Sequence, residues 1–126
     1  MADKKKVLLV DDDAAVTRLL KEMLELTGRF EVLTENNGSL ALATARRFRP
    51  QVIFLDINMP DMEGSAAAEQ IKADPILARV PVVFLTGAVT SQEIGGDTGV
   101  IGGQTFLPKP VTSAQLVACI DKLIGS

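Results

Sequence analysis

Two groups of acidic side chains in this sequence could bind a metal ion or attack phosphorus. Asp11, Asp12 and Asp13 follow one short apolar run, and Asp56 follows another. If both runs are strands of one sheet, these acids lie close together and repel one another unless a cation joins them. Such oxygen ligands favour a hard divalent ion like Mg²⁺, which keeps waters that a phosphate can replace. A carboxylate can also attack phosphorus and form an aspartyl phosphate.

A hydroxyl and an amine follow two further apolar runs. Thr86 comes directly after residues 80–85, and Lys109 comes soon after residues 104–107. If these runs belong to the same sheet, both side chains lie on the rim that carries the acids. They could then hydrogen-bond to the oxygens of a phosphoryl group and neutralise their charge.

The apolar pattern predicts the elements that position these residues. Short continuous apolar runs are typical of strands buried on both faces, and stretches with apolar residues at helical spacing lie between them. Strands that alternate with helices favour right-handed crossovers and a parallel sheet. The predicted strands are residues 7–10, 30–34, 52–55, 80–85 and 104–107, and the predicted helices are residues 16–24, 38–47, 65–73 and 112–124.

We therefore expect one doubly wound, flavodoxin-like α/β domain over residues 1–126, with helices on both faces. Its five parallel strands would have the order 2-1-3-4-5. In this order the carboxyl ends of strands 1 and 3 form the switch point at which ligands bind. Asp13 is expected to cap the first helix, and Thr112 and Gln115 have the spacing of a capping box for the last one.

Composition narrows the function further. The chain has no histidine, which excludes a His-based triad and most zinc sites. Its net charge of −3 argues against direct binding of nucleic acid or of an anionic membrane. No apolar run approaches the ~18 residues of a membrane span, and the first residues do not resemble a signal peptide. The single cysteine, Cys119, lies in an apolar helical pattern and is expected to be buried, so we expect a cytoplasmic protein.

Motifs at the strand ends resemble those of a known family, the receiver domains of two-component response regulators. The resemblance covers essentially the whole chain, and each motif is weak alone but specific in this order. The motifs are Val10-Asp11-Asp12, residues 55–60 (Leu-Asp-Ile-Asn-Met-Pro), Gly64, Leu85-Thr86 and Pro108-Lys109-Pro110.

The resemblance implies a Mg²⁺-dependent phosphoacceptor site. Asp56 would accept the phosphoryl group from a histidine kinase or a phosphotransfer protein. Asp56, Asp12 and the backbone carbonyl of Asn58 would ligate Mg²⁺, and Asp11 would contribute through water. The chain would catalyse only its own phosphorylation and dephosphorylation, and it would not otherwise be an enzyme.

The resemblance also implies a switch. Thr86 would bond to the phosphoryl group, Lys109 would pair with it, and Phe106 would turn inward as Thr86 moves. The Lys109–Pro110 bond would be cis. Because no DNA-binding segment follows residue 126, output would run through a protein partner or through an output domain outside this sequence.

Simpler interpretations exist for each of these residues. Asp11 and Asp12 could be solubilising or capping acids, Thr86 could simply end a strand, Lys109 could be a surface lysine, and Phe106 could belong to the core. Function is favoured because all of these side chains converge on one rim.

The segment at residues 87–103 departs from the family pattern. It holds six of the ten glycines in the chain, and each glycine disfavours a helix by about 1 kcal/mol relative to alanine. We expect a short or mobile fourth helix, with only residues 90–94 in helical pattern. This leaves the usual output surface of the family in doubt.

Three other classes of protein fit the sequence less well. A pseudo-receiver would be an interaction module that is never phosphorylated, and the complete set of acids counts against it. A haloacid-dehalogenase-like phosphatase requires an acid where this chain has Asn58. A flavodoxin-like cofactor carrier would need aromatic side chains to stack on a flavin, and this chain has no Trp or Tyr.

Overall fold

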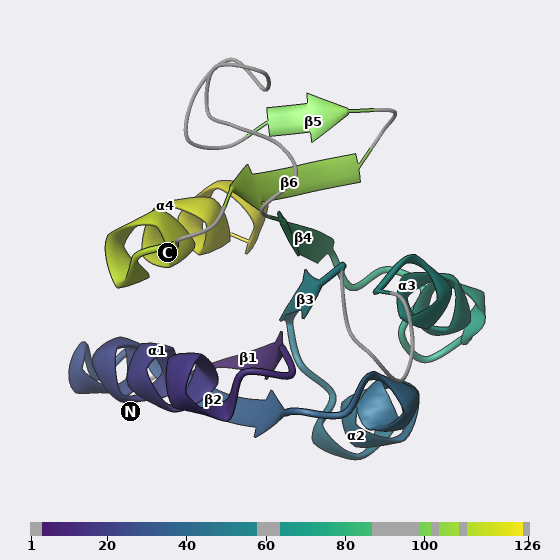
Figure 1. Ribbon diagram of the computed structural model, residues 1–126, viewed down its shortest axis with the longest axis horizontal. Helices are drawn as coiled ribbons and strands as arrows, with labels where there is room; N and C mark the ends of the chain where they lie inside the picture. The colour runs from purple at the N-terminus through teal and green to yellow at the C-terminus, as the bar shows by residue number, and fades with distance from the viewer. Residues whose placement is uncertain (1–3, 58–63, 87–98, 102–103, 109–110, 125–126) are drawn as a thin grey trace.

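A central parallel sheet organises the protein (Figure 1). The computed structural model describes residues 4–57, 64–86, 99–101, 104–108 and 111–124. The sheet order is β2-β1-β3-β4-β6-β5, in which all pairs are parallel except β5 with β6. The strands are β1 (Lys5–Val10), β2 (Phe30–Glu35), β3 (Val52–Asp56), β4 (Val82–Thr86), β5 (Gly99–Ile101) and β6 (Gln104–Pro108).

The five parallel strands confirm the predicted order, with β6 as the fifth strand in that order. The sequence did not predict β5, which pairs antiparallel with β6 at the edge of the sheet. Its three residues lie in the glycine-rich segment and are too few to show the alternation by which strands are predicted. The short helix predicted at residues 90–94 lies outside the described residues.

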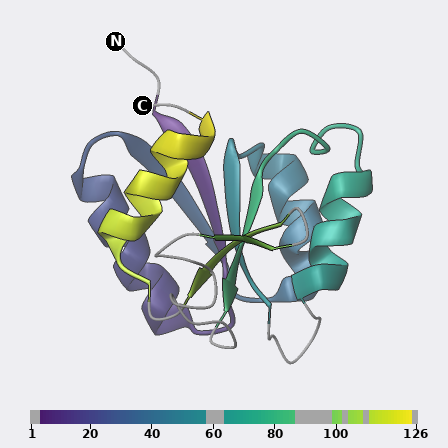
Figure 2. The same ribbon diagram turned by 90° about the horizontal axis from the view of Figure 1, so that it is seen from above.

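Helices cover both faces of the sheet (Figure 2). One face carries α1 (Ala14–Leu26) and α4 (Ser113–Ile124), which contact each other. The other face carries α2 (Ala41–Phe48), which follows the short 3₁₀ helix η1 (Gly38–Leu40), and α3 (Gly64–Ala73). The described helices therefore form two layers around the sheet, as the doubly wound fold requires.

The central strands are buried on both faces, which explains their continuous apolar runs. In β1, Val7 and Leu9 pack under α1 and α4, whereas Leu8 and Val10 pack under α2 and α3. All four side chains are at most 1% exposed. Because successive side chains of a strand point to opposite faces, one run of apolar residues supplies both cores.

Helix ends follow the predicted capping chemistry. Asp13 accepts hydrogen bonds from the backbone N–H groups of Ala15 and Val16 and so caps α1. At α4, the backbone N–H of Gln115 donates to Thr112 Oγ1 at 3.2 Å, and the backbone N–H of Thr112 donates to Gln115 Oε1 at 2.8 Å. These reciprocal bonds form the expected capping box.

Cys119 on α4 is buried, as predicted, and burial raises the pKa of its thiol to about 11.

An ion pair between a buried carboxylate and an arginine that is 55% exposed joins the two helices on the second face. Arg46 of α2 donates to the carboxylate of Asp74, which follows α3 and also accepts from the backbone N–H of Ile76 at 2.8 Å. Burial alone would raise the pKa of this carboxyl, but the hydrogen bond and charge of Arg46 and the backbone N–H groups outweigh it. The pKa of Asp74 therefore lies below its ordinary value. The ionised carboxylate thus stabilises the packing of α3 against α2.

Replacing Asp74 by Asn is expected to lower the free energy of unfolding at pH 7. A carboxyl whose pKa is lowered on folding contributes stability above its unfolded-state pKa, and this contribution is lost as the pH falls through the folded-state value. The difference between wild type and Asp74→Asn should therefore shrink on acidification. This difference in the free energy of unfolding is measured by urea unfolding at pH 7 and at pH 3, monitored by circular dichroism.

The matched control is Asp121→Asn. Asp121 pairs with Arg29, but its side chain is 36% exposed, against 2% for Asp74, and ion pairs with exposed carboxylates contribute little. A loss in Asp74→Asn that is equal at both pH values, or no larger than that in Asp121→Asn, would contradict the assignment.

Candidate functional site

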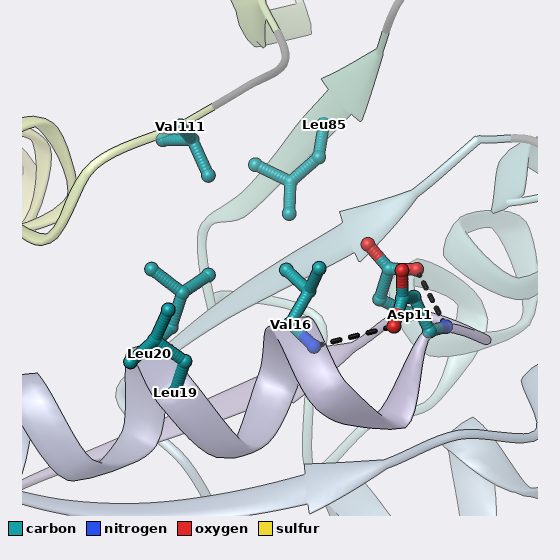
Figure 3. Close-up of a pocket in the computed structure, with 7 residues that line it drawn as sticks. Asp11, Val16, Leu19, Leu20, Leu85 and Val111 are labelled. Atoms are coloured by element: carbon teal, nitrogen blue, oxygen red, sulfur yellow. Dashed lines mark hydrogen bonds between the residues drawn. The ribbon is translucent and has the colours of Figure 1, made fainter.

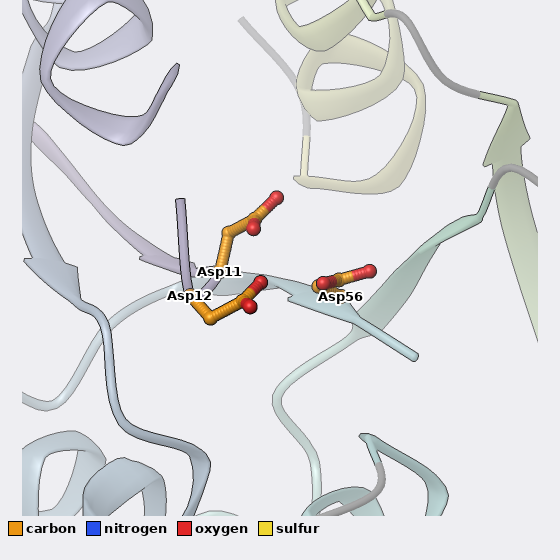
Figure 4. A group of neighbouring side chains, drawn as sticks. All are labelled: Asp11, Asp12 and Asp56. Carbon is orange, nitrogen blue, oxygen red and sulfur yellow. The ribbon is translucent and has the colours of Figure 1, made fainter. Parts of the chain in front are cut away.

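Three acids meet at the carboxyl ends of β1 and β3. Asp56 is the last residue of β3, Asp11 directly follows β1, and the register that pairs Val10 with Leu55 places the two acids side by side. One carboxylate oxygen from each of Asp11, Asp12 and Asp56 lies within 4.8 Å of the others (Figure 4). The structure therefore brings together the acids that the strand pattern placed at one rim.

The electrostatics of this cluster fit a divalent cation. Asp11 and Asp56 are only 2% and 3% exposed, whereas Asp12 is open to solvent. The pKa of Asp12 is raised, first by partial loss of solvent around its carboxyl, then by a hydrogen bond with Asp11 and by the negative charges of Asp11 and Asp56. Hard oxygen ligands that repel one another, one of them facing water, suit Mg²⁺ with retained waters.

The turn that carries the acids is held by its neighbours. The backbone N–H of Asp11 donates to Glu35 O at 3.1 Å, and the carboxylate of Asp11 accepts from the backbone N–H of Asp13 at 3.0 Å. The side-chain amide of Asn36 donates to the carbonyl of Asp11 at 2.7 Å. Asp13 uses its own carboxylate to cap α1, as predicted, and is not a member of the cluster.

The sequence analysis did not single out Asn36. Its signal was available, because the register pairs Val10 with Glu35 and so sets Asn36 beside Asp11 at the same rim. The strand-end pattern singled out the residues after the first, third, fourth and fifth predicted strands, and not those after the second.

Of the other predicted site residues, the structure describes Thr86 and Phe106. Thr86 is the last residue of β4 and is 1% exposed. It follows Leu85, the residue that pairs with Asp56. Phe106 of β6 is half-buried and packs on Phe84, with ring centroids 5.4 Å apart. Asn58, Lys109 and the Lys109–Pro110 bond lie outside the described residues.

An apolar groove adjoins the acids (Figure 3). It has a volume of about 460 Å³ and extends from Asp11 along α1. Its apolar lining is Val16, Leu19, Leu20, Leu85 and Val111.

The groove exists because the apolar face of α1 is broader than its buried stripe. The structure buries Leu20 and Leu24 but leaves Val16, Leu19 and Met23 39%, 57% and 42% exposed. Helical spacing alone did not separate these two sets, because residues at positions i, i+3, i+4 and i+7 share one side of a helix.

Comparison with known proteins identifies the family. The chain matches the response regulator receiver domain over residues 7–121, and it belongs to this family. Among the described residues, no helix combines the length and apolar character needed to cross a membrane. Membership argues against the phosphatase and the flavin-carrier interpretations, whereas the pseudo-receiver interpretation lies within the family.

Three relatives illustrate the match. The chain is 44% identical over 105 residues to a protein-glutamate methylesterase/protein-glutamine glutaminase of Rhodospirillum rubrum, covering 83% of this chain and 28% of that protein. It is 30% identical to the polar-differentiation response regulator DivK of Brucella anthropi, covering 96% and 97%. The receiver domain of sensor histidine kinase PA1611 from Pseudomonas aeruginosa, solved with magnesium in its active-site cleft, superposes with a TM-score of 0.79 at 27% identity, covering 98% and 100%.

These matches define a signalling module of two-component systems. Phosphorylation and Mg²⁺ binding are features of the family. The chain spans between 28% and 48% of the length of the first three curated relatives it matches.

Replacing Asp12 by Asn is expected to weaken Mg²⁺ binding by at least about tenfold, because the cluster loses the one carboxylate that faces water. Isothermal titration of the protein with MgCl₂ measures the affinity. Asp13→Asn is the matched control, since Asn also caps a helix well and Asp13 lies outside the cluster. Equal affinities in the two variants would place the metal elsewhere.

Proposed function

We propose that this chain is a phosphorylation-controlled receiver that accepts a phosphoryl group on Asp56 and thereby switches its protein contacts. The observation that carries the proposal is the position of Asp56. Its nearly buried carboxylate stands at the end of β3, within 4.8 Å of those of Asp11 and Asp12. A carboxylate among acids that a cation can neutralise is suited to attack phosphorus.

The residues that would hold Mg²⁺ are Asp12, Asp56 and the backbone carbonyl of Asn58 directly, with Asp11 acting through a water. When bound, the ion would offset the negative charge of the acids and of the incoming phosphoryl oxygens. The chemistry of the donor set supports this assignment, because all of its members are hard oxygen ligands.

The proposed transfer is an in-line displacement. A histidine kinase or a phosphotransfer protein presents a phosphohistidine, and a carboxylate oxygen of Asp56 attacks its phosphorus. An O–P bond forms, the N–P bond breaks, and the departing imidazole takes a proton from solvent. The Thr86 hydroxyl donates a hydrogen bond to a phosphoryl oxygen, and Lys109 balances the charge. Hydrolysis later releases phosphate and restores Asp56, so the chain catalyses only its own modification.

The switch would operate through β4 and β6. Thr86 ends β4, and Phe106 lies on β6 in register with Phe84 of β4. Movement of Thr86 toward the phosphoryl group would favour the inward position of Phe106. Phosphorylation would thereby shift the population between two conformations of the domain. The output is a protein partner or a joined output domain, and the net charge of −3 disfavours direct nucleic-acid binding. We place this exchange in the cytoplasm, where the thiol of Cys119 stays reduced.

Intact mass after incubation with acetyl phosphate tests phosphorylation. Wild type should gain a single phosphoryl adduct with Mg²⁺ and none after chelation, and Asp56→Asn should gain none under either condition. The adduct should map to the peptide that contains Asp56, because no other acid of the cluster ends a strand. Absence of any adduct, also with a cross-reacting histidine kinase as donor, would favour the pseudo-receiver, which binds partners without phosphorylation.

A protein donor would dock on the apolar groove along α1. To bring a phosphohistidine within bonding distance of Asp56, a donor must cover the rim around the acids, and the groove is continuous with that rim at Asp11. Its exposed members, Val16 and Leu19, offer apolar area that a donor can bury. Small donors such as acetyl phosphate need no such contact.

Replacing Leu19 by Gln is therefore expected to slow phosphotransfer from a protein donor by about fivefold or more, because a buried anchor of an interface is lost. Labelling by acetyl phosphate should keep its wild-type rate. Leu26→Gln is the matched control: Leu26 lies on the same helix, is 86% exposed and does not line the groove. Equal slowing in both variants, or no slowing in Leu19→Gln, would show that the donor binds elsewhere. Radiolabelled transfer from a cross-reacting histidine kinase provides the measurement.

A further inference from the structure

We infer that Asn36 is a positioning residue for the metal site, which fixes the backbone of the acidic turn so that Asp12 is aligned before Mg²⁺ binds. The inference rests on the proposed function in one respect, the binding of Mg²⁺ at the acidic cluster. Asn36 follows β2 and touches none of the reacting atoms proposed above, so it acts through Asp11 and Asp12.

The side-chain amide of Asn36 makes two hydrogen bonds from one nitrogen. Nδ2 donates to the backbone carbonyl of Asp11 at 2.7 Å and to Thr17 Oγ1 at 2.9 Å. Asn36 itself is exposed, but both residues that it binds are 2% exposed. A buried acceptor that loses its donor is costly, so these bonds constrain the turn more strongly than surface bonds would.

The bond to Asp11 fixes the peptide group that leads into Asp12. A peptide group is planar, so the carbonyl of Asp11 and the N–H of Asp12 turn together. The neighbouring strand also holds the other end of Asp11, because its backbone N–H donates to Glu35 O at 3.1 Å. With both backbone groups of Asp11 bound to consecutive residues, the peptide plane from which Asp12 projects is fixed, which narrows the directions open to the Asp12 side chain.

The segment that holds the turn is itself anchored. The carboxylate of Glu35 accepts from Thr44 Oγ1 of α2 at 2.6 Å and from the backbone N–H of Asn37 at 3.1 Å. The hydroxyl of Thr17, the second acceptor of Asn36, lies 3.2 Å from Ala14 O in the first turn of α1. Asn36 therefore connects the acidic turn to α1, and its neighbour Glu35 connects the same segment to α2 on the opposite face of the sheet.

Asparagine suits this position for a chemical reason. Its amide nitrogen carries two N–H donors, which match the two acceptors, whereas an ionised aspartate only accepts and alanine offers neither. Groups that orient metal ligands commonly change metal affinity by about 10- to 100-fold when they are removed.

The test is Asn36→Ala, with Mg²⁺ affinity measured by isothermal titration. Affinity should fall by about tenfold. In a second measurement, the rate of labelling by acetyl phosphate is followed as Mg²⁺ is raised. The half-saturating Mg²⁺ concentration should increase by the same factor, while the rate at saturating Mg²⁺ stays near wild type. A merely structural defect would lower the labelled fraction at every concentration and leave this midpoint unchanged.

Asn37→Ala is the matched control. Asn37 is also exposed, and its side chain accepts from the backbone N–H of Ser39 at 3.0 Å at the start of η1, without a bond to the acidic turn. It should keep the wild-type midpoint. Unchanged Mg²⁺ affinity in Asn36→Ala, or an equal loss in Asn37→Ala, would overturn the inference.

The titration separates this inference from the proposed function, because it needs no phosphodonor. A wild-type protein that binds Mg²⁺ but never becomes labelled would overturn the proposed function and leave the effect of Asn36 measurable. A wild-type protein that binds no Mg²⁺ would overturn the inference itself.

Discussion

The confinement of three carboxylates at the end of a buried sheet is the constraint on which the rest of the structure depends. Asp11 and Asp56 are attached to β1 and β3, whose central residues have almost no exposure, so these acids cannot separate without disturbing the strands. Their repulsion is therefore retained in the fold, and it adds to the loss of solvent and the hydrogen bond with Asp11 that raise the pKa of Asp12. A site that holds like charges together in this way is preorganised to bind a cation.

The backbone conformation of the turn determines the role of each of its three acids. Three consecutive residues have the same side chain, yet the carboxylate of Asp13 accepts from the first turn of α1 while those of Asp11 and Asp12 point into the cluster. The difference arises because Asp13 already precedes the helix, where free N–H groups are available. Bonds from residues 35 and 36 then hold Asp11 at its backbone. The acidic cluster and the helix cap thus share one turn without using the same carboxylates.

Much of this arrangement was predictable from the sequence, because burial on both faces of β1 and β3 leaves an unbroken apolar run that ends at an acid. The position of Asp56 followed from that pattern, the strand order from the alternation of strands with helices, and the cap from the place of Asp13 before the first helix. The strand β5 did not, because it pairs through backbone groups and has only three residues. The exposure of Leu19 was not predictable either, since it depends on how closely α4 and the segment before it approach α1. Asn36 was not predicted because its partners, Asp11 and Thr17, lie 25 and 19 positions away and are brought near it by the pairing of β1 with β2.

The separation of the core into two clusters has a consequence for how such a domain tolerates change. The sheet lies between two layers of helices (Figure 2). Val7 and Leu9 belong to the cluster on one face, and Leu8 and Val10 belong to the cluster on the other. Side chains on opposite faces share few neighbours, so their substitutions should combine almost additively in stability. One face can therefore accumulate mutations that reshape α1 and its groove while the opposite face stays unaltered. The acidic rim is supported by both faces, so it is the part of the molecule in which substitutions are tolerated least.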